Sequence, residues 1–205
     1  MSAIVKLHKN DLPANVSFSG SVAIDTETLG LKPHRDRLCL VQLSAGDGNA
    51  HLVQLDGKDF SVPRLKVLLT DPAVLKIFHF GRFDLAVLAH HLGVMPEPVY
   101  CTKIASKLAR TYTDRHGLKD LCGELLGVEL SKQQQSSDWG ADKLSDQQRH
   151  YAASDVLYLH ALKEKLDHML AREGRVAAAD ACFRFLPMRV RLDLAGFDDI
   201  DIFAH

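Results

Sequence analysis

Two carboxylates stand one residue apart in the segment IDTETLGL, residues 24–31. The apolar run before them predicts a buried strand over residues 21–26. In an extended chain, residues i and i+2 point to the same face, so Asp25 and Glu27 would lie side by side and repel each other. A cation would relieve this repulsion, and ligands that offer only oxygen suit Mg²⁺ or Mn²⁺. A pair of exposed turn acids is the alternative, since a chain with 26 acids in 205 residues contains about three such pairs by chance.

Further acidic positions favour the metal site. Tyr151 and Asp155 in YAASD lie four residues apart on a predicted helix, so they share one helical face. Much of that helix is apolar, and an acid that borders a buried surface needs a partner. Asp84 follows a predicted strand and stands near a predicted helix start, where the helix dipole offers a simpler explanation. These residues could join Asp25 and Glu27 in one site if the fold brings them together.

The elements that must position these residues follow from hydrophobic periodicity and turn signals. Three predicted strands come first, at residues 21–26, 37–45 and 50–55, and the turn GDGN makes the last two a hairpin. Next come a helix at 62–70, a strand at 73–80, a helix over 81–93 that Gly93 ends and a loop at 96–99. This order, with helices after it, predicts an α/β fold in which helices flank a mixed central sheet.

The second half of the chain is mainly helical by the same criteria. The expected segments are a helix over 102–111 with Thr102 as its cap, a helix over 118–127 that Gly127 ends, a polar and mobile connection over 131–143, and one long helix over 145–174 that Ser145 opens. The final stretch, 183–205, is apolar but irregular, so core closure and an assembly surface both stay open.

Composition indicates a soluble globular protein of about one domain. Of its 205 residues, 46% are apolar and 25% are charged. The sequence contains no run of 18 apolar residues, so it predicts no membrane span. The N-terminus lacks the apolar core of a signal peptide, and the four cysteines are far apart without a CxxC pair, so we expect a reduced, cytoplasmic protein. The net charge of −1 argues against a protein that coats long nucleic acid but leaves room for a short anionic substrate.

Three segments resemble, in order, the exonuclease motifs of the DEDD superfamily: VAIDTETLGL, KIFHFGRFDLAVL and DWGADKLSDQQRHYAASDVLYLHAL. The tyrosine in the third motif is typical of the subgroup that includes ribonuclease D. The match spans residues 22–162 and contains all four acids and Tyr151. The resemblance implies a ribonuclease-H-like fold and 3′-to-5′ exonucleolytic hydrolysis that uses two divalent cations, Mg²⁺ or Mn²⁺.

The resemblance also implies a role for each residue of the site. Asp25 would bridge both cations, while Glu27 and Asp155 would complete the site of the cation that holds the attacking water. Asp84 would support the second cation, and the Tyr151 hydroxyl would orient or deprotonate the water.

Within this group, the segment AIDTETLGLKPHRDRLCLVQLS and the short chain are most similar to the compact nano-RNase C enzymes. That resemblance implies very short RNA substrates, dinucleotides among them, and a homo-oligomer, since these relatives form octameric rings. We expect one exonuclease domain over residues 1–205, without the helical accessory domain of full-length ribonuclease D and with a tail, 176–205, in oligomer contacts. After DW the chain has Asp142 and Lys143 where Arg-Pro is common in ribonuclease D, which leaves that substrate contact unassigned.

Seven residues are candidates for contact with RNA, and each also has a structural explanation. Lys103, Lys107 and Arg110 fall on one face of a predicted helix, where they could hold phosphate or simply face solvent. Leu31 would separate two bases, as a leucine does in related oligoribonucleases, or be an ordinary loop residue. The other candidates are Thr26, His79 and Tyr112, the last of which begins a possible stacking and charge cluster with Arg115, His116 and Lys119.

Other functions stay open at this point. One is a broader nuclease that trims RNA 3′ ends or acts on DNA, and another is a catalytically dead nucleic-acid-binding module. The intact set of four acids and a tyrosine argues against the dead module, because loss of one carboxylate is the simplest route to inactivity.

Overall fold

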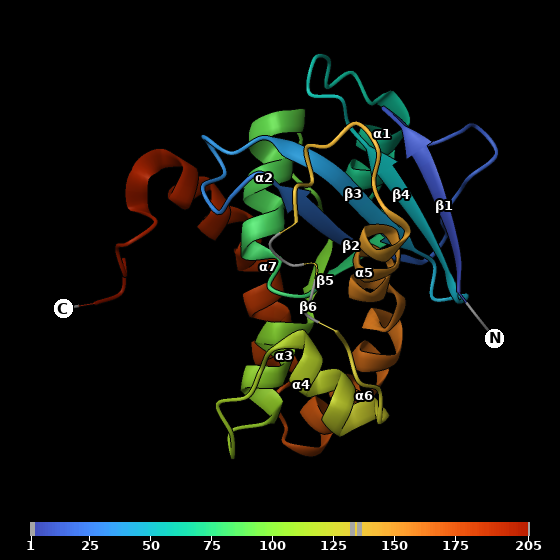
Figure 1. Ribbon diagram of the computed structural model, residues 1–205. Coiled ribbons are helices and arrows are strands. Elements are labelled where there is room, and N and C mark those ends of the chain that lie inside the picture. Colours follow the sequence, from blue (N-terminus) through green and yellow to red (C-terminus); the bar gives the residue numbers. More distant parts are fainter. Residues whose placement is uncertain (1–2, 132–133, 135–136, 205) are drawn as a thin grey trace.

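A six-stranded mixed sheet forms the centre of the molecule (Figure 1). The computed structural model describes residues 3–131, 134 and 137–204. Across the sheet, the strands follow the order β1-β4-β3-β2-β5-β6. The strands are β1 (Ile4–Lys9), β2 (Ser21–Thr28), β3 (Leu38–Ser44), β4 (Asn49–Gln54), β5 (Leu75–Phe78) and β6 (Val99–Cys101). The predicted α/β fold with a mixed central sheet is confirmed.

The antiparallel strands β2, β3 and β4 correspond to the first three predicted strands, and β3 and β4 form the predicted hairpin. Asp25 on β2 lies opposite Gln42 on β3, and Gln42 lies opposite Leu52 on β4. The pairing of β2 with β3 shifts between Glu27 and Thr28, an irregularity of the kind that bends a strand next to a site. The β2–β3 register therefore decides that Gln42 is the residue of β3 that lies opposite Asp25.

The edge strands β1 and β6 are absent from the elements predicted above. β1 pairs in parallel with β4, and β6 pairs in parallel with β5. The short β6 begins at Val99, inside the segment predicted as a loop. Parallel partners lie far apart in the chain, so no local turn signal marks such strands.

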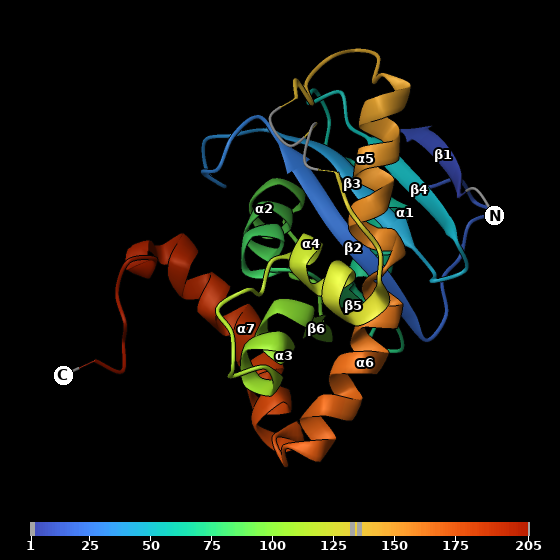
Figure 2. The same ribbon diagram turned by 60° about the horizontal axis from the view of Figure 1, so that its bottom comes forward.

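Helices lie in front of and behind the sheet (Figures 1 and 2). Helix α5 packs against β2, β3 and β4, while α2 packs against β2, β3 and α7. The helices are α1 (Pro63–Thr70), α2 (Arg82–Leu92), α3 (Thr102–Ala109), α4 (Leu118–Leu121), α5 (Asp146–Leu157), α6 (Leu159–Arg172) and α7 (Val176–Leu192), with two π-helical segments, η1 (Cys122–Leu126) and η2 (Asp193–Phe197). Helix α5 is the element that meets the face of β2 with the two acids.

Two predictions about the helices are wrong. The single long helix is two helices, because the chain breaks at Tyr158 between α5 and α6. The tail is regular up to Leu192, since α7 continues through Pro187 and buries Phe183 and Val190 in the core. Burial of this helical face outweighs the loss of one backbone hydrogen bond at the proline.

Three predicted helix ends are confirmed. Ser145 forms a capping box at the start of α5, and Gly93 and Gly127 both adopt left-handed backbone angles at the C-terminal ends of their helices. Thr102, by contrast, makes no cap: it is the first residue of α3, and its hydroxyl donates to the backbone oxygen of Phe78. No described helix combines the length and the apolar character that crossing a membrane requires.

The polar connection before α5 is tied to the sheet over its second part. Residues 132–133 and 135–136 lie outside the described residues. Beyond them, Trp139 is buried, and the side-chain amide of Gln54 donates to the backbone oxygen of Ala141 at 2.8 Å. The ammonium of Lys9 donates to the backbone oxygen of Asp142 at 3.0 Å. The prediction of a mobile connection is therefore wrong for residues 139–142.

Candidate active site

Three carboxylates from two elements converge at one place on the sheet. Asp25 and Glu27 lie on β2, and Asp155 lies on α5, which crosses that face. One side-chain oxygen from each residue lies within 4.8 Å of the other two. All three residues stay partly accessible to solvent. A cluster of carboxylate oxygens matches the ligand preference of Mg²⁺ and Mn²⁺.

Asp84, in the first turn of α2, lies outside the group of three but close enough for its charge to raise the pKa of each of them. The Thr26 hydroxyl donates to Oδ1 of Asp84 at 2.7 Å, and both residues are buried. Successive residues in a strand point to opposite faces, so Thr26 points away from the two acids beside it. The Thr26 side chain, a candidate for contact with RNA, is therefore already engaged with an acid of the site.

Burial and mutual repulsion oppose ionisation of all four carboxyl groups together. Burial, reinforced by the charges of Asp155 and Asp84, raises the pKa of Glu27 to about 9. Burial raises the pKa of Asp84 to about 7 against the effect of the Thr26 hydroxyl, and burial with the charge of Asp84 raises the pKa of Asp155 to about 7. Burial and the three other carboxylates hold the pKa of Asp25 well above its ordinary value. A divalent cation would favour the ionised forms, since metal ligands must be deprotonated.

Tyr151 lies one turn before Asp155 on α5, as the sequence predicts. Its ring centroid lies 6.1 Å from that of the buried Trp139. Burial and the nearby charges of Asp155 and Glu27 raise the pKa of the Tyr151 hydroxyl far above its ordinary value. The hydroxyl is therefore neutral at physiological pH, which suits a group that orients water better than one that removes a proton from it.

Gln42 is a residue of the site that the sequence reasoning missed. Its Nε2 donates to Oδ2 of Asp25 at 3.1 Å across the β2–β3 pair. The signal in the sequence is a single amide inside the otherwise apolar run LCLVQL, since a polar side chain in a buried strand needs a partner. Only the register identifies Asp25 as that partner.

In the loop after β2, Leu31 is exposed to solvent, whereas Gly30 lies against the Asp36 side chain. Leu31 is 84% exposed, which leaves its side chain free for contact with a base. A Cβ on Gly30 would lie 2.3 Å from a carboxylate oxygen of Asp36, so glycine is needed there because of that carboxylate. The Asp36 carboxylate in turn accepts from the backbone nitrogen of Lys32 at 2.9 Å and pairs with Arg35. This intraloop contact holds the segment that carries Leu31.

His79 and Lys103 lie where β5 and α3 meet. His79 Nδ1 lies 2.9 Å from the Thr102 hydroxyl oxygen, and burial together with the charge of Lys103 lowers the pKa of His79 to about 3. His79 is therefore neutral at physiological pH. The Lys103 ammonium lies 4.0 Å from the ring centroid of Phe80, which is exposed and adopts a left-handed backbone angle. Both candidates for contact with RNA thus have structural partners as well.

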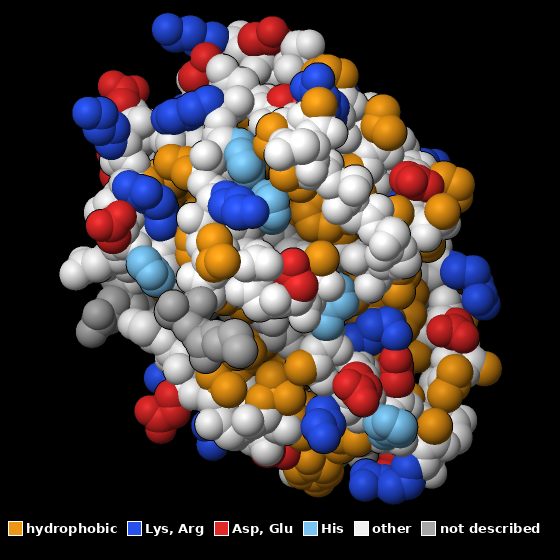
Figure 3. All heavy atoms as spheres, turned by 90° about the vertical axis from the view of Figure 1, so that its right-hand side faces the viewer, with side chains coloured by type: hydrophobic (Ala, Val, Ile, Leu, Met, Phe, Trp, Pro, Cys, Tyr) orange, Lys and Arg blue, Asp and Glu red, His pale blue; other side chains and the backbone are white. Residues whose placement is uncertain are grey.

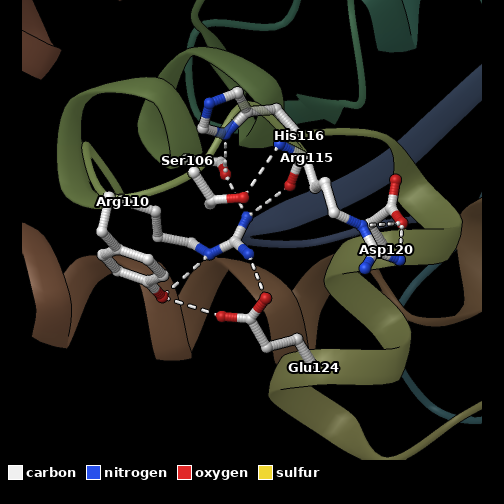
Figure 4. Close-up of polar contacts among 8 residues, drawn as sticks. Ser106, Arg110, Arg115, His116, Asp120 and Glu124 are labelled. Atoms are coloured by element: carbon white, nitrogen blue, oxygen red, sulfur yellow. Dashed lines mark hydrogen bonds and ion pairs between the residues drawn. The ribbon is translucent and has the colours of Figure 1, made fainter.

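Arg110 does not belong to a solvent-facing basic surface. Its side chain is fully buried, and its guanidinium donates to the Ser106 hydroxyl at 3.0 Å and to the Arg115 backbone oxygen at 2.8 Å (Figure 4). It also forms an ion pair with Glu124. The exposed Lys107 does not share this environment. The prediction that Arg110 lies with it on one accessible face is wrong, because Arg110 follows the last residue of α3 and turns inward.

Tyr112 lies at the edge of the same network, where it contacts both Arg110 and Glu124. Its hydroxyl donates to Glu124 at 2.8 Å and accepts from Nε of Arg110 at 3.3 Å, while the residue is 65% exposed. The hydroxyl is anchored, and the ring stays available for stacking on a base. His116 Nδ1 lies 2.8 Å from the Ser106 hydroxyl oxygen, so this residue too is engaged within the network.

Comparison with known proteins defines the class. The 3′–5′ exonuclease family matches residues 5–171, and the chain belongs to this family. Ribonuclease D of Gluconacetobacter diazotrophicus is 37% identical over 155 residues, which are 76% of this chain and 39% of that protein. The chain thus spans about two fifths of the length of such curated relatives. Within the family, it falls in the ribonuclease D group, as the three motifs predicted.

Among solved structures, this chain is similar over its whole length to NrnC, an enzyme of the nano-RNase C type. Brucella melitensis NrnC bound to pGG is 61% identical to this chain, with a TM-score of 0.95 and complete coverage of both chains. Brucella melitensis NrnC with bound Mg²⁺ is 59% identical, with a TM-score of 0.93 and complete coverage of both chains. The predicted fold class and the predicted resemblance are therefore confirmed.

Proposed function

We propose that this chain is a 3′–5′ exoribonuclease that depends on two divalent cations, Mg²⁺ or Mn²⁺, and hydrolyses very short RNA, dinucleotides above all, to nucleoside 5′-monophosphates. The convergence of Asp25, Glu27 and Asp155 within 4.8 Å carries the proposal. The family to which the chain belongs supports the reaction, and the similarity to NrnC bound to pGG supports the substrate.

The residues of the chain divide the work in this proposal. Asp25, Glu27 and Asp155 would hold one cation, and Asp25 together with Asp84 would support the second. Bound there, divalent cations would supply Lewis-acid activation of a water and charge neutralisation at the leaving oxygen. The neutral hydroxyl of Tyr151 orients the water on the face of α5 next to Asp155.

The distribution of charge supports a short substrate. On the side of the molecule that Figure 3 presents, which is the right-hand side in Figure 1, basic and acidic side chains alternate without a continuous basic track. Long single strands usually need such a track. The exposed Leu31 and Tyr112 side chains are the proposed base contacts, and His79, Lys103 and Lys107 the proposed sugar or phosphate contacts. Arg110 is left out of this set because its guanidinium is buried and paired.

We extend the proposal to the assembly: the chain forms a homo-oligomer of the octameric type. The segment after α7 leads away from the rest of the molecule in Figure 1. It exposes apolar side chains, as does the last part of α7; these are Phe185, Met188, Phe197, Ile200, Ile202 and Phe203. Buried in contacts between copies, these side chains would no longer be exposed to water. Light scattering on the purified chain tests this, and a mass of 22.7 kDa, that of one copy, would contradict it.

The proposed location is the cytoplasm. All four cysteines, Cys39, Cys101, Cys122 and Cys182, are free thiols. Free thiols persist in a reducing compartment.

A time course on 5′-labelled RNAs of two to seven nucleotides tests the function. With Mg²⁺ or Mn²⁺ we expect rapid conversion of dinucleotides to mononucleotides and slower shortening of the longer RNAs. Equal rates at every length would favour a broader ribonuclease D type of trimming, and equal rates on DNA would favour a general exonuclease. Hydrolysis that persists in chelator would contradict the metal-dependent reaction, and binding without hydrolysis would indicate a dead module.

A further inference from the structure

Gln42 occupies an unusual position for a polar side chain. It lies in the middle of β3, a strand in which every residue is buried, and it is itself inaccessible to solvent. Its register partner on one side is Asp25 of β2, and on the other side it is the buried Leu52 of β4. Side chains that lie opposite each other on paired strands share a face of the sheet, so the amide projects between a carboxylate and an apolar side chain.

The hydrogen bonds of this amide are one-sided. Nε2 donates to Oδ2 of Asp25 at 3.1 Å, whereas the buried Oε1 has no hydrogen-bond partner among the described residues. A buried amide that leaves one of its groups unpaired destabilises the fold, because the desolvation of that group is not compensated. An apolar residue of similar size would avoid this cost in a layer that already contains Leu52 and Leu40. The contact with Asp25 is therefore the one interaction in the described structure that accounts for glutamine at this position.

We infer that Gln42 is a positioning residue for the metal site: its amide holds Oδ2 of Asp25 and thereby fixes the orientation in which this carboxylate meets those of Glu27 and Asp155. Without that bond, the carboxylate of Asp25 can turn about its Cβ–Cγ bond. Some of the resulting orientations no longer direct its oxygens toward those of Glu27 and Asp155. The inference rests on the proposed function of this site as a cation site. It places in β3 a residue that lies outside the three motifs of acids and tyrosine.

Two apolar variants and one control test this. Gln42→Met keeps the length of the side chain and removes the donor. Gln42→Leu also removes the donor but has a different shape. An effect that both variants share therefore comes from loss of the donor and not from a packing defect in one of them. Ser44→Ala is the matched control. Ser44 lies two residues along the same buried strand, and its hydroxyl donates to the backbone oxygen of Asn49 at 2.7 Å, away from the acids.

The first readout is binding of Mn²⁺ alone to the full chain, measured by calorimetry without RNA, and the second is the Mn²⁺ concentration that half-activates hydrolysis of a dinucleotide. In both Gln42 variants we expect a loss of about 10–100-fold in metal affinity, the usual effect of removing a partner of a metal ligand. The value of kcat at limiting metal should fall, KM for the dinucleotide should stay, and Ser44→Ala should match the native chain in metal affinity.

Native metal affinity and native half-activation in Gln42→Met would overturn the inference. So would a decline in activity of that variant with unchanged metal affinity, which a purely structural role would produce. The proposed function fails separately, if the native chain binds Mn²⁺ yet hydrolyses no RNA. In that case the affinities of the two variants still decide the role of Gln42.

Discussion

The hydroxyl of Thr26 donates a hydrogen bond of 2.7 Å to the carboxylate of Asp84, which joins β2 to the first turn of α2. The two residues are 58 positions apart in the chain. Thr26 stands between Asp25 and Glu27, so one short segment supplies two acids to one face and a hydroxyl to the other. Through this bond, the strand that carries two acids also orients a third.

Replacing Thr26 tests that relationship. Thr26→Val keeps the shape of the side chain and removes the hydroxyl donor to the buried carboxylate of Asp84, which keeps its backbone donors, at a cost of about 1–3 kcal/mol. Since the hydroxyl opposes the rise in the pKa of Asp84, that pKa should rise further. We expect kcat to fall about 10–100-fold at fixed metal concentration, as for loss of a partner of a metal ligand. Thr26→Ser, which keeps the hydroxyl, should retain most of the activity, and equal activity of the two variants would contradict the role of the bond.

Removal of the Tyr151 hydroxyl should separate turnover from metal binding. The ring of Tyr151 packs near Trp139, so Tyr151→Phe should preserve the fold. Because the hydroxyl is proposed to orient the water, kcat should fall about 10²-fold, the order of loss that follows when a reacting group is misplaced by about 1 Å. Calorimetry with Mn²⁺ should give the native affinity. Unchanged hydrolysis would remove Tyr151 from the mechanism.

Stabilisation by metal should increase with pH. Without a cation, the folded-state pKa values of Asp84 and Asp155 are raised to about 7 and that of Glu27 to about 9. The folded chain therefore binds more protons than the unfolded chain above about pH 4, where unfolded carboxyl groups ionise. The contribution of these groups to stability in chelator is fully present below about pH 4 and is lost as the pH rises through their folded-state values.

The measurement is the difference in Tm between samples with Mg²⁺ and with chelator, from pH 5 to 9. Metal requires the ionised carboxylates, so the difference should grow over this range. Glu27→Gln, which removes the group with a pKa near 9, should flatten the upper part of the curve. A difference in Tm that shrinks as the pH rises would contradict the assignment of these acids to the cation.

Arg110 should matter for stability more than for phosphate binding. Arg110→Met removes the guanidinium that donates to the buried Ser106 hydroxyl and to the Arg115 carbonyl and that pairs with Glu124, while His116 stays next to Ser106 and Tyr112 still donates to Glu124. Glu124 is itself partly exposed, so water can solvate the charge that remains, and we expect a loss of about 1–3 kcal/mol in urea unfolding. Lys107→Met, at an exposed position in α3, should change stability by less than about 0.5 kcal/mol. Equal stability of the two variants would contradict this view of the network.

The sequence by itself determined the acids, the tyrosine and the order of most elements. The spacing of Asp25 and Glu27 places them on one face whatever the rest of the chain does, because a strand repeats every two residues. The spacing of Tyr151 and Asp155 places them on one face of a helix for the same kind of reason. The caps at Ser145, Gly93 and Gly127 are equally local, since side-chain bonds or left-handed backbone angles decide them within a few residues.

Only the tertiary structure decided which polar groups meet across elements. The partnership of Gln42 with Asp25 depends on the β2–β3 register, and that of Thr26 with Asp84 depends on how α2 docks on β2. The burial of Arg110 depends on where the chain turns after α3. Helical periodicity predicts the direction in which a side chain leaves the helix axis. It does not predict which groups of other elements lie in that direction. Long-range packing therefore determined which charges of this chain are buried in the structure and which stay exposed to solvent.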